Sequence, residues 1–414
     1  MTRVGVQDGT NPRWPSAPPR QTGHEARFGR GMLMAVDRIM FSRPFAAGLE
    51  EGYLLEALRS TVWHGDGPFT ARATAWLKGY TGAAEALLTT SCTHALEMAA
   101  ILLDLGPGDE VLCPSFTFPS TATAIAIRGA TPVFVDIRPD TLNIDPAAAE
   151  AAITDRTRAI FVVHYGGIAA DLPEFQRICA QYGLALVEDN AHSLGASWQG
   201  RHLGTFGTFA TQSWHDTKNI TCGEGGALLI NDTSFRARAE AIREKGTDRS
   251  RFLRGEIDKY SWVDAGSSYL PSDLLSAILL AQFERFEQIQ GVRSAVWQAY
   301  DEQLGAWADD HGVRRMVVPD GCIQPAHLYF VIMPGPDDQL GLIEHLGRQS
   351  IVATFHYQPL DSSTAGLRYG RTPAPCTVTA DTSQRLVRLP LHPGMTEADT
   401  SRVIAAIQGY RSRS

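Results

Sequence analysis

From Thr89 to Gly246, continuous apolar runs alternate with segments of helical apolar spacing, and this alternation constrains the fold more than any other feature. Apolar strands separated by helices indicate a largely parallel sheet covered by helices on both faces. In such sheets, ligands bind beyond the carboxyl ends of the strands. The expected strands are residues 110–116, 131–137, 158–167, 184–192, 207–214 and 225–232. The expected helices are residues 93–105, 121–130, 145–153, 172–183 and 234–246, with Asp145 capping the third.

The pattern changes after about residue 290, which predicts a second domain. Long helical segments at 292–312 and 338–350 are mixed there with short strands such as 327–333. We therefore expect a large α/β domain over residues 37–290 and a smaller α+β domain over residues 291–414. Residues 1–36 are rich in Pro, Gly and Arg without periodicity, which predicts a disordered tail.

Composition excludes several classes of function. A formal net charge of -8 argues against nucleic acid as a partner. No apolar run approaches the roughly 20 residues that span a bilayer, and the N-terminus lacks the apolar core of a signal peptide, so we expect no membrane partner. The six cysteines form no CxxC pair, which favours a reducing cytoplasm over a disulfide framework and predicts no metal site.

Polar residues gather at three of the expected strand ends. Asp189 and His192 follow one buried run, and Ser213 ends another, five residues before Lys218. Lys218 is one of only four lysines and lies in the loop "SWHDTKNITCGEGG". The segment "TTSCTHAL" places Cys92 and Thr93 at a helix start, where free backbone N–H groups favour a phosphate. Each feature alone has an ordinary structural explanation as a cap, a turn or a solvated lysine.

Together these residues indicate the chemistry of pyridoxal phosphate (PLP). This cofactor needs a lysine that forms an imine with its aldehyde, a carboxylate on its pyridine nitrogen and a site for its phosphate. An aromatic residue should cover the ring, and "PSFTFPST" offers Phe116 and Phe118. The order of helix start, carboxylate and lysine matches that of aspartate-aminotransferase-like PLP enzymes.

The chain resembles the DegT/StrS-type sugar aminotransferases, and within them the dTDP-4-amino-4,6-dideoxyhexose transaminases. The resemblance covers about Ile39 to the C-terminus. The stretches that carry it include "LEMAAILLDLGPGDEVLCPSFTFPSTA", "FVDIRPDTLNID", "VEDNAH", "HDTKN", "GEGGALLIND", "GSSYL", "AHLYF" and "FHYQPL". It implies the type I fold of PLP-dependent transferases, with a large α/β/α domain around a mostly parallel sheet and a smaller C-terminal α+β domain.

The resemblance also implies roles for individual residues. Lys218 forms the imine and Asp189 contacts the pyridine nitrogen, while PLP passes through its amino form, PMP, during turnover. The other implied cofactor ligands are Cys92, Thr93 and Ser213 at the phosphate, Phe118 on the ring, His192 at the phenolic oxygen, and Ser268 from the partner subunit. In this sequence Cys92 replaces the commoner glycine of the phosphate site, and Asp361 replaces the histidine of "HYxPLH".

The substrate site is less defined by sequence. We expect it to include His164, Tyr165, Lys245, Arg249, His327, His356 and Tyr357. Lys245 and Arg249 lie in an arginine-rich stretch that is either a solvated charged loop or a cationic rim for a substrate diphosphate.

The expected function is transfer of an amino group from glutamate to C4 of dTDP-4-keto-6-deoxyhexose. The expected enzyme is a cytoplasmic homodimer or higher oligomer whose active sites are completed across the interface. Alternatives are amination of a 3-keto sugar, a PLP-dependent sugar dehydratase, and a non-catalytic regulatory protein. Dehydratases of this fold typically replace the lysine by histidine, and a regulatory protein tolerates its loss, so Lys218 argues against both.

Overall fold

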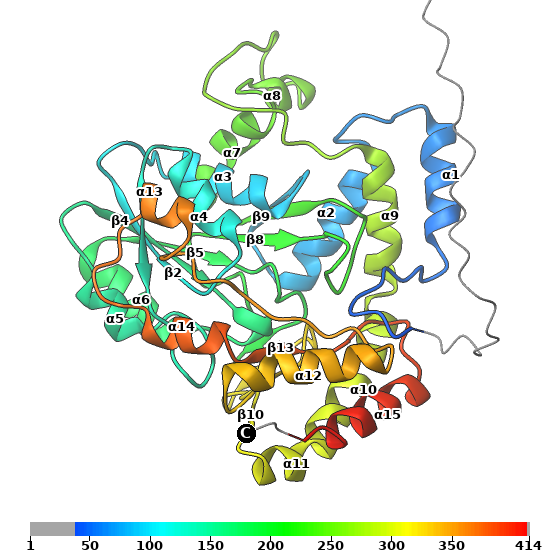
Figure 1. Cartoon of the computed structure of the whole chain (residues 1–414). Coiled ribbons are helices and arrows are strands. Elements are labelled where there is room, and N and C mark those ends of the chain that lie inside the picture. The colour runs from blue at the N-terminus through cyan, green and yellow to red at the C-terminus, as the bar shows by residue number, and fades with distance from the viewer. Residues whose placement is uncertain (1–37, 412–414) are drawn as a thin grey trace, which may run out of the picture. The chain divides into compact units, whose positions relative to one another are not determined.

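The structure is a computed structural model that describes residues 38–411. The expected tail over residues 1–36 lies outside the described residues. From Arg38 onward the chain packs as one compact unit (Figure 1). Its helices are α1 (Glu50–Ser60), α2 (Pro68–Thr81), α3 (Cys92–Leu102), α4 (Pro119–Ala126), α5 (Pro146–Ala151), α6 (Leu172–Tyr182), α7 (Arg236–Arg243), α8 (Arg249–Leu253), α9 (Asp273–Glu284), α10 (Phe286–Gln303), α11 (Gly305–Asp310), α12 (Pro336–Arg348), α13 (Thr364–Tyr369), α14 (Thr377–Ser383) and α15 (Glu397–Gln408), with short 3-10 turns at Tyr165–Gly167 and Thr233–Phe235.

A seven-stranded sheet forms the centre, in the order β1-β9-β8-β5-β4-β2-β3. Strand β9 runs antiparallel to both of its neighbours, and the other pairs are parallel. The predicted α/β fold with a mostly parallel sheet is therefore confirmed. The strands are β1 (Glu85–Thr89), β2 (Glu110–Pro114), β3 (Thr131–Val135), β4 (Thr157–Val163), β5 (Ala185–Asp189), β8 (Phe209–Ser213) and β9 (Gly226–Ile230).

The strands are largely apolar because both faces of the sheet are buried. In β4, Ala159 and Phe161 belong to the core that α3, α4 and α7 complete. The alternate residues Ile160 and Val162 belong to the core on the other face, with Phe175 from α6. Helices α2 and α9 enclose a third cluster beside β1 and β9. Side chains of a strand alternate between faces, so helices on both sides require the continuous apolar runs of the sequence.

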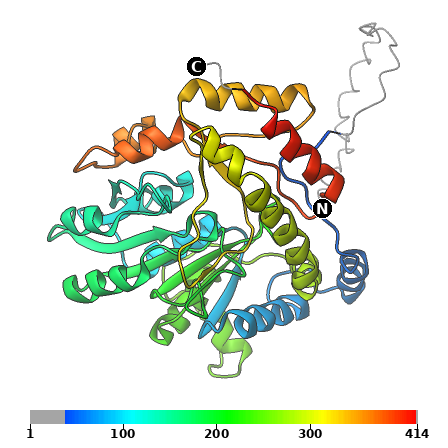
Figure 2. The same cartoon turned by 90° about the horizontal axis from the view of Figure 1, so that it is seen from below.

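The C-terminal elements pack on the same core. Helices α10, α12 and α15 lie together at the bottom of Figure 1; in Figure 2, which views the molecule from below, α12 and α15 lie toward the top and α10 runs down beside α15. The expected helix 292–312 is interrupted at Leu304, between α10 and α11. The boundary expected at residue 290 falls inside α10, and the division into two domains stays a prediction. The small strands are β10 (Arg314–Arg315), β12 (Phe330–Ile332) and β13 (Leu386–Arg388) in one sheet and β6 (Ser197–Trp198), β7 (Arg201–His202) and β11 (Cys322–Ile323) in another.

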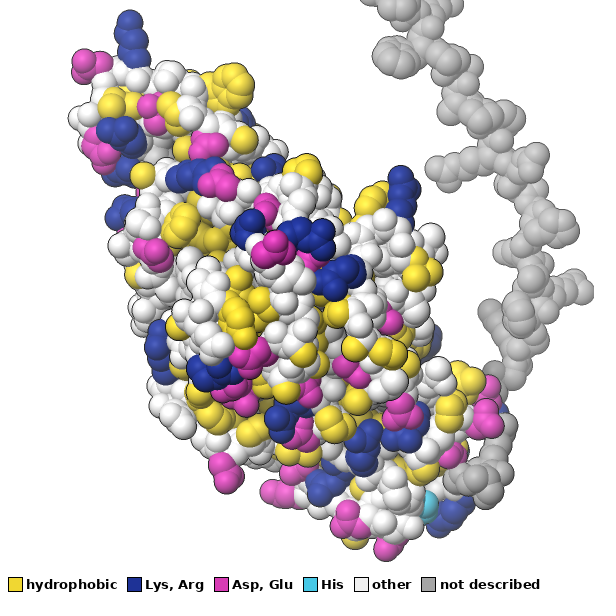
Figure 3. Space-filling model, turned by 90° about the vertical axis from the view of Figure 1, so that its left-hand side faces the viewer, with side chains coloured by type: hydrophobic (Ala, Val, Ile, Leu, Met, Phe, Trp, Pro, Cys, Tyr) yellow, Lys and Arg dark blue, Asp and Glu magenta, His cyan; other side chains and the backbone are white. Residues whose placement is uncertain are grey.

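The surface carries mixed charge. On the face in Figure 3, basic and acidic side chains alternate rather than gathering by sign. Within residues 38–411, no helix has the length and apolar character needed to cross a membrane.

Candidate active site

The candidate site is built where β1, β5 and β8 end. Asp189 is the last residue of β5 and Ser213 the last of β8. Gly226 begins the antiparallel strand β9 and pairs with both Thr89 and Ser213. A Cβ atom on Gly226 would lie 2.4 Å from the backbone nitrogen of Cys92, so glycine is what allows β9 to meet the start of α3.

The start of α3 presents free backbone N–H groups. Ser91 has an extended backbone, and its side chain accepts the amide of His94 at 3.1 Å. The amides of Cys92 and Thr93 have no acceptor within the helix, because the helix has no carbonyl four residues before them. The Cys92 thiol meets the hydroxyl of Thr211 on β8 at 3.3 Å, and burial raises the pKa of this thiol. A neutral thiol leaves the site favourable for an anion such as a phosphate.

Asp189 is a buried carboxyl held on both oxygens. The hydroxyl of Thr121 donates to Oδ2 at 2.7 Å, and the amide of Ala191 donates to Oδ1 at 3.2 Å. Burial raises the pKa of Asp189, while these two bonds and the charge of Lys218 oppose the rise. The carboxylate of Asp189 would gain a positively charged partner if a protonated pyridine nitrogen were bound beside it.

The neighbouring Glu188 points the other way, into the core. Its carboxylate accepts the amides of Gly204, Phe206 and Gly207 at 2.7–2.8 Å and the Nε2 proton of His164 at 3.0 Å. The second ring nitrogen of His164 accepts the amide of Ala170 at 3.1 Å, and the His164 side chain is fully buried. Both ring nitrogens of His164 are thus engaged inside the fold, and its expected role in substrate binding stays a prediction.

Hydrogen bonds on both sides of Lys218 hold the loop that carries it. The carbonyl of Trp214 accepts the hydroxyl of Thr221 and the amide of Cys222, each at 3.1 Å. Asn219 donates to the carbonyl of Pro325 at 2.7 Å. Burial lowers the pKa of Lys218 to about 8, Cys92 and Asp189 oppose the shift, and the charge of Arg388 adds to it. These mutual effects show that the fold brings Lys218, Asp189 and Cys92 into one site.

A wall of three histidines and two tyrosines adjoins Lys218. His192 stacks on His327 with 4.2 Å between ring centroids, and the hydroxyl of Tyr165 meets Nδ1 of His356 at 2.9 Å. The hydroxyl of Tyr357 lies 3.4 Å from Nε2 of His192. Burial lowers the pKa of all three histidines well below the usual value and raises those of both tyrosines. The wall is therefore neutral at physiological pH.

The hydrogen bonds assign the tautomers of two of these histidines. The amide of Gly166 donates to Nδ1 of His192 at 3.3 Å, so neutral His192 carries its proton on Nε2. Because the amide nitrogen of Asn219 donates to a carbonyl, its oxygen accepts from Nδ1 of His327 at 2.8 Å. His192 is thus prepared to donate a hydrogen bond to an oxygen in the site.

The two candidate aromatic residues lie differently. Phe118 is 58% exposed at the start of α4, with its centroid 6.3 Å from that of Tyr357. Phe116 is buried and packs edge-on against Tyr165 and Tyr357. Only Phe118 has a free face on which a planar ring could stack.

Of the remaining predicted residues, Lys245, Arg249 and Ser268 lie around Glu244, whereas Thr93 lies at the start of α3. Lys245 and Arg249 both pair with Glu244, at 3.0 and 3.5 Å. Ser268 is exposed and forms a backbone bridge with the same Glu244. Helix α8 and the chain around it project at the top of Figure 1. Thr93 lies at the site, with its hydroxyl 2.7 Å from that of Ser120.

Sequence reasoning missed Arg388, a half-buried residue at the end of β13. Its charge acts on Tyr165, Tyr357 and the three histidines of the wall. The available signal was a single arginine inside the apolar run "LVRLPL".

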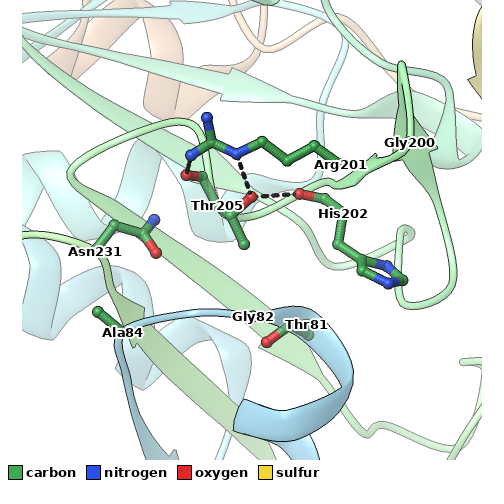
Figure 4. Close-up of a pocket in the computed structure, with 8 residues that line it drawn as sticks. All are labelled: Thr81, Gly82, Ala84, Gly200, Arg201, His202, Thr205 and Asn231. Carbon is green, nitrogen blue, oxygen red and sulfur yellow. Dashed lines mark hydrogen bonds between the residues drawn. The ribbon is translucent and has the colours of Figure 1, made fainter.

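A shallow pocket of about 430 Å³ lies at the opposite ends of strands β1 and β9 (Figure 4). Ala84 precedes β1 and Asn231 follows β9, so this pocket faces away from the strand ends that carry the site. The guanidinium of Arg201 in this pocket already donates hydrogen bonds to the hydroxyl and the carbonyl of Thr205. This pocket is not the active site.

The residues at the strand ends fit pyridoxal phosphate. They supply an amine with a pKa of about 8, a buried carboxyl, free amides at a helix start, and an exposed aromatic face. Among residues 38–411, no group of acidic, histidine or cysteine side chains could hold a metal ion. The fold and site thus define a PLP-dependent aminotransferase of the aspartate-aminotransferase-like type.

Comparison with known proteins agrees. The DegT/DnrJ/EryC1/StrS aminotransferase family matches residues 47–408, and the chain belongs to this family. The aminotransferase TlmJ from Streptoalloteichus hindustanus is similar, with 28% identity, a TM-score of 0.83, and coverage of 90% of this chain and 98% of that one. 3-Amino-5-hydroxybenzoic acid synthase has 29% identity, a TM-score of 0.81 and the same coverage.

A third similar structure bears on the cofactor. It is Spr1654 from Streptococcus pneumoniae in its PMP-form, with 25% identity, a TM-score of 0.82, and coverage of 90% of this chain and 97% of that one. The protein described here is accordingly a PLP-dependent sugar aminotransferase.

Proposed function

We propose that the enzyme transfers the amino group of glutamate to C4 of dTDP-4-keto-6-deoxyhexose. The observation that carries this proposal is the convergence of Lys218, Asp189 and the free amides of α3 on one site, within a chain whose motifs resemble the dideoxyhexose transaminases. The product would serve the synthesis of a deoxyaminosugar for a glycosylated natural product or a surface polysaccharide.

Each residue then has a defined task. When bound, PLP supplies an electron sink that stabilises negative charge on the substrate carbon. Asp189 holds the proton on the ring nitrogen, and His192 donates its Nε2 proton toward the phenolic oxygen. The amides of Cys92 and Thr93, with the hydroxyl of Ser213, hold the phosphate, and Phe118 covers the ring.

Lys218 would take a proton from the reacting carbon of the amino donor and, in the second half of the reaction, give one to the carbon of the keto sugar that becomes aminated. A pKa of about 8 places its amine near the pH of the cell, where both protonation states are populated. A general acid and base works best when its pKa lies near the working pH.

We also propose that the enzyme is a cytoplasmic homodimer or a higher oligomer that shares its active sites. All six cysteines are unpaired, which suits a reducing compartment. Ser268 is exposed, as a residue that reaches a partner's phosphate site must be. We also propose that Lys245 and Arg249 bind the substrate diphosphate. Each side chain would then have to share its ion pair with Glu244 or break it.

The position of amination is open to a direct test. The enzyme is incubated with glutamate and with the 4-keto or the 3-keto dTDP-sugar separately, and the ring couplings of each product are read by NMR. Amination of the 4-keto sugar alone supports the proposal. Amination of the 3-keto sugar alone refutes C4 while leaving the family assignment untouched.

A further inference from the structure

The side chain of Asn219 joins the loop of Lys218 to a distant part of the chain. Its amide nitrogen donates to the carbonyl of Pro325 at 2.7 Å and to Oε1 of Gln290 at 3.2 Å, and its oxygen accepts from Nδ1 of His327 at 2.8 Å. Asn219 is buried and directly follows Lys218 in the sequence. Three hydrogen bonds therefore meet at the residue next to the reactive amine.

The other hydrogen bonds of this loop, residues 215–224, are local. Among residues 38–411, the remaining side-chain and backbone hydrogen bonds of the loop run to partners within residues 214–225. Ile220 adds apolar packing in the cluster beside β1 and β9, so the loop has a second, non-polar attachment. Within the described part of the chain, Asn219 is thus the polar link between the loop and the rest of the fold.

The segment 325–327, to which this link runs, is rigidly held. The guanidinium of Arg293, buried in α10, donates to two carbonyls of the segment at 3.0 and 2.6 Å. A Cβ atom on Gly167 would lie 2.2 Å from Cδ of Pro325, so the segment fits closely against that turn. Ala326 has a φ of 46°, in the left-handed region, and a residue with a Cβ keeps this form only where its surroundings enforce it. A loop bonded to this segment is therefore held at a fixed place.

The same link fixes the proton of His327. Because Asn219 offers its oxygen to Nδ1, neutral His327 carries its proton there and a lone pair on Nε2. Burial lowers the pKa of His327 well below the usual value, and nearby charges add to this shift. The ring stacks on His192 at 4.2 Å between centroids. Asn219 thus contacts the loop of Lys218 on one side and the histidine wall on the other.

We propose that Asn219 is a positioning residue, which holds Lys218 within reach of PLP by anchoring its loop to residues 325–327. The partners of Asn219 are protein groups, so it acts on the reaction through Lys218 and His327. An amide suits this task because it donates and accepts at once. Aspartate would lose the donor, and alanine would lose both. The inference rests on the proposed role of Lys218 in bonding PLP.

The test uses the full-length protein after removal of PLP, and its Asn219→Ala variant. PLP is added in a stopped-flow instrument, and the second-order rate constant for attack by the enzyme's amine is followed against pH. The plateau at high pH reports how well the amine is placed, whereas the midpoint reports its protonation. We expect Asn219→Ala to lower the plateau about tenfold or more, since a displacement of the amine slows attack. The midpoint should remain near 8.

The midpoint should remain because the variant removes no charge near Lys218. The groups that act on Lys218, or on which its charge acts, are Cys92 of α3, Asp189 of β5, Arg388 of β13, and His192, His327 and His356 of the wall. If the loop instead opened to water, burial would no longer lower the pKa of Lys218, and the midpoint would return toward 10.5. The two effects are therefore separable in one titration.

Asn231→Ala is the matched control. The amide of Asn231 donates to the carbonyls of Gly204 and Gly207 at 3.1 and 2.8 Å, and Asn231 lies in the shallow pocket of Figure 4, away from Lys218. This variant loses the same kind of hydrogen bond at a distant place. Its plateau should stay within about twofold of wild type.

Asn219→Asp provides a second measurement if Asn219→Ala does not fold. It keeps the shape and the acceptor for His327, so its plateau should lie between those of wild type and Asn219→Ala; only the plateau is compared, because this variant adds a charge. A plateau within about twofold of wild type in either Asn219 variant, an equal loss in Asn231→Ala, or a midpoint near 10.5 in Asn219→Ala would overturn the proposal. Attachment of PLP to another lysine of the wild-type enzyme would instead overturn the proposed role of Lys218 itself.

Discussion

The most quantitative prediction concerns the protonation of Lys218 in the cofactor-free protein. Only an unprotonated amine attacks an aldehyde. An ordinary lysine has a pKa of 10.5, and burial lowers that of Lys218 to about 8. At pH 7.5 about one quarter of Lys218 is then unprotonated, against about one part in a thousand for an ordinary lysine, a gain of roughly 200-fold.

The assay follows the visible absorbance in a stopped-flow instrument after PLP is mixed with cofactor-free enzyme at several pH values. The second-order rate constant for attack should rise with pH and level off above a midpoint near 8. The direction follows because deprotonation creates the reactive form. Removal of the Arg388 charge in Arg388→Gln should move the midpoint upward, since this charge lowers the pKa of Lys218. A rate constant that still rises tenfold per pH unit above pH 9 would refute the reasoning.

Four other predictions follow from particular contacts. Asp189→Asn should lower kcat about a hundredfold or more, because a neutral amide no longer keeps the ring nitrogen protonated, and near-full activity would show a wrong assignment. Gly226→Ala should weaken PLP binding about tenfold or more in a fluorescence titration, because its Cβ would lie 2.4 Å from the Cys92 nitrogen and the start of α3 would have to move. Glu188→Ala should cost about 4 kcal/mol or more in urea unfolding, since three amides and His164 lose their acceptor, and a loss below about 1 kcal/mol would contradict it. Sedimentation at assay concentration should show at least a dimer, and a fully active monomer would rule out shared active sites.

The sheet was the part of the fold most open to sequence analysis. Strands buried on both faces need continuous apolar runs, and β2, β4 and β5 carry them. Asp145 was also predictable as a cap and accepts two amides at the start of α5. The reversed direction of β9 was not predicted, because strand direction depends on pairing with β1 and β8 across long stretches of chain.

The site was predictable where residue type alone limits the chemistry. Lys218 and Asp189 are placed together, as their order after strand ends implies. The contacts of His164 could not be predicted, because Glu188 and the amide of Ala170 meet its ring only in the folded chain. Arg388 was missed because its significance comes from its place beside the histidine wall, with no carboxylate partner among residues 38–411, which no sequence pattern records.

The central claim is that Lys218 bonds the cofactor of a sugar aminotransferase. It is tested most directly by reducing the PLP-loaded enzyme with borohydride and mapping the modified peptide by mass spectrometry. The chain has only four lysines, so the result is unambiguous. The cofactor should be found on Lys218 alone, and Lys218→Ala should remain unlabelled, folded and inactive. A label on Lys78, Lys245 or Lys259, or retained amination by Lys218→Ala, would contradict the assignment.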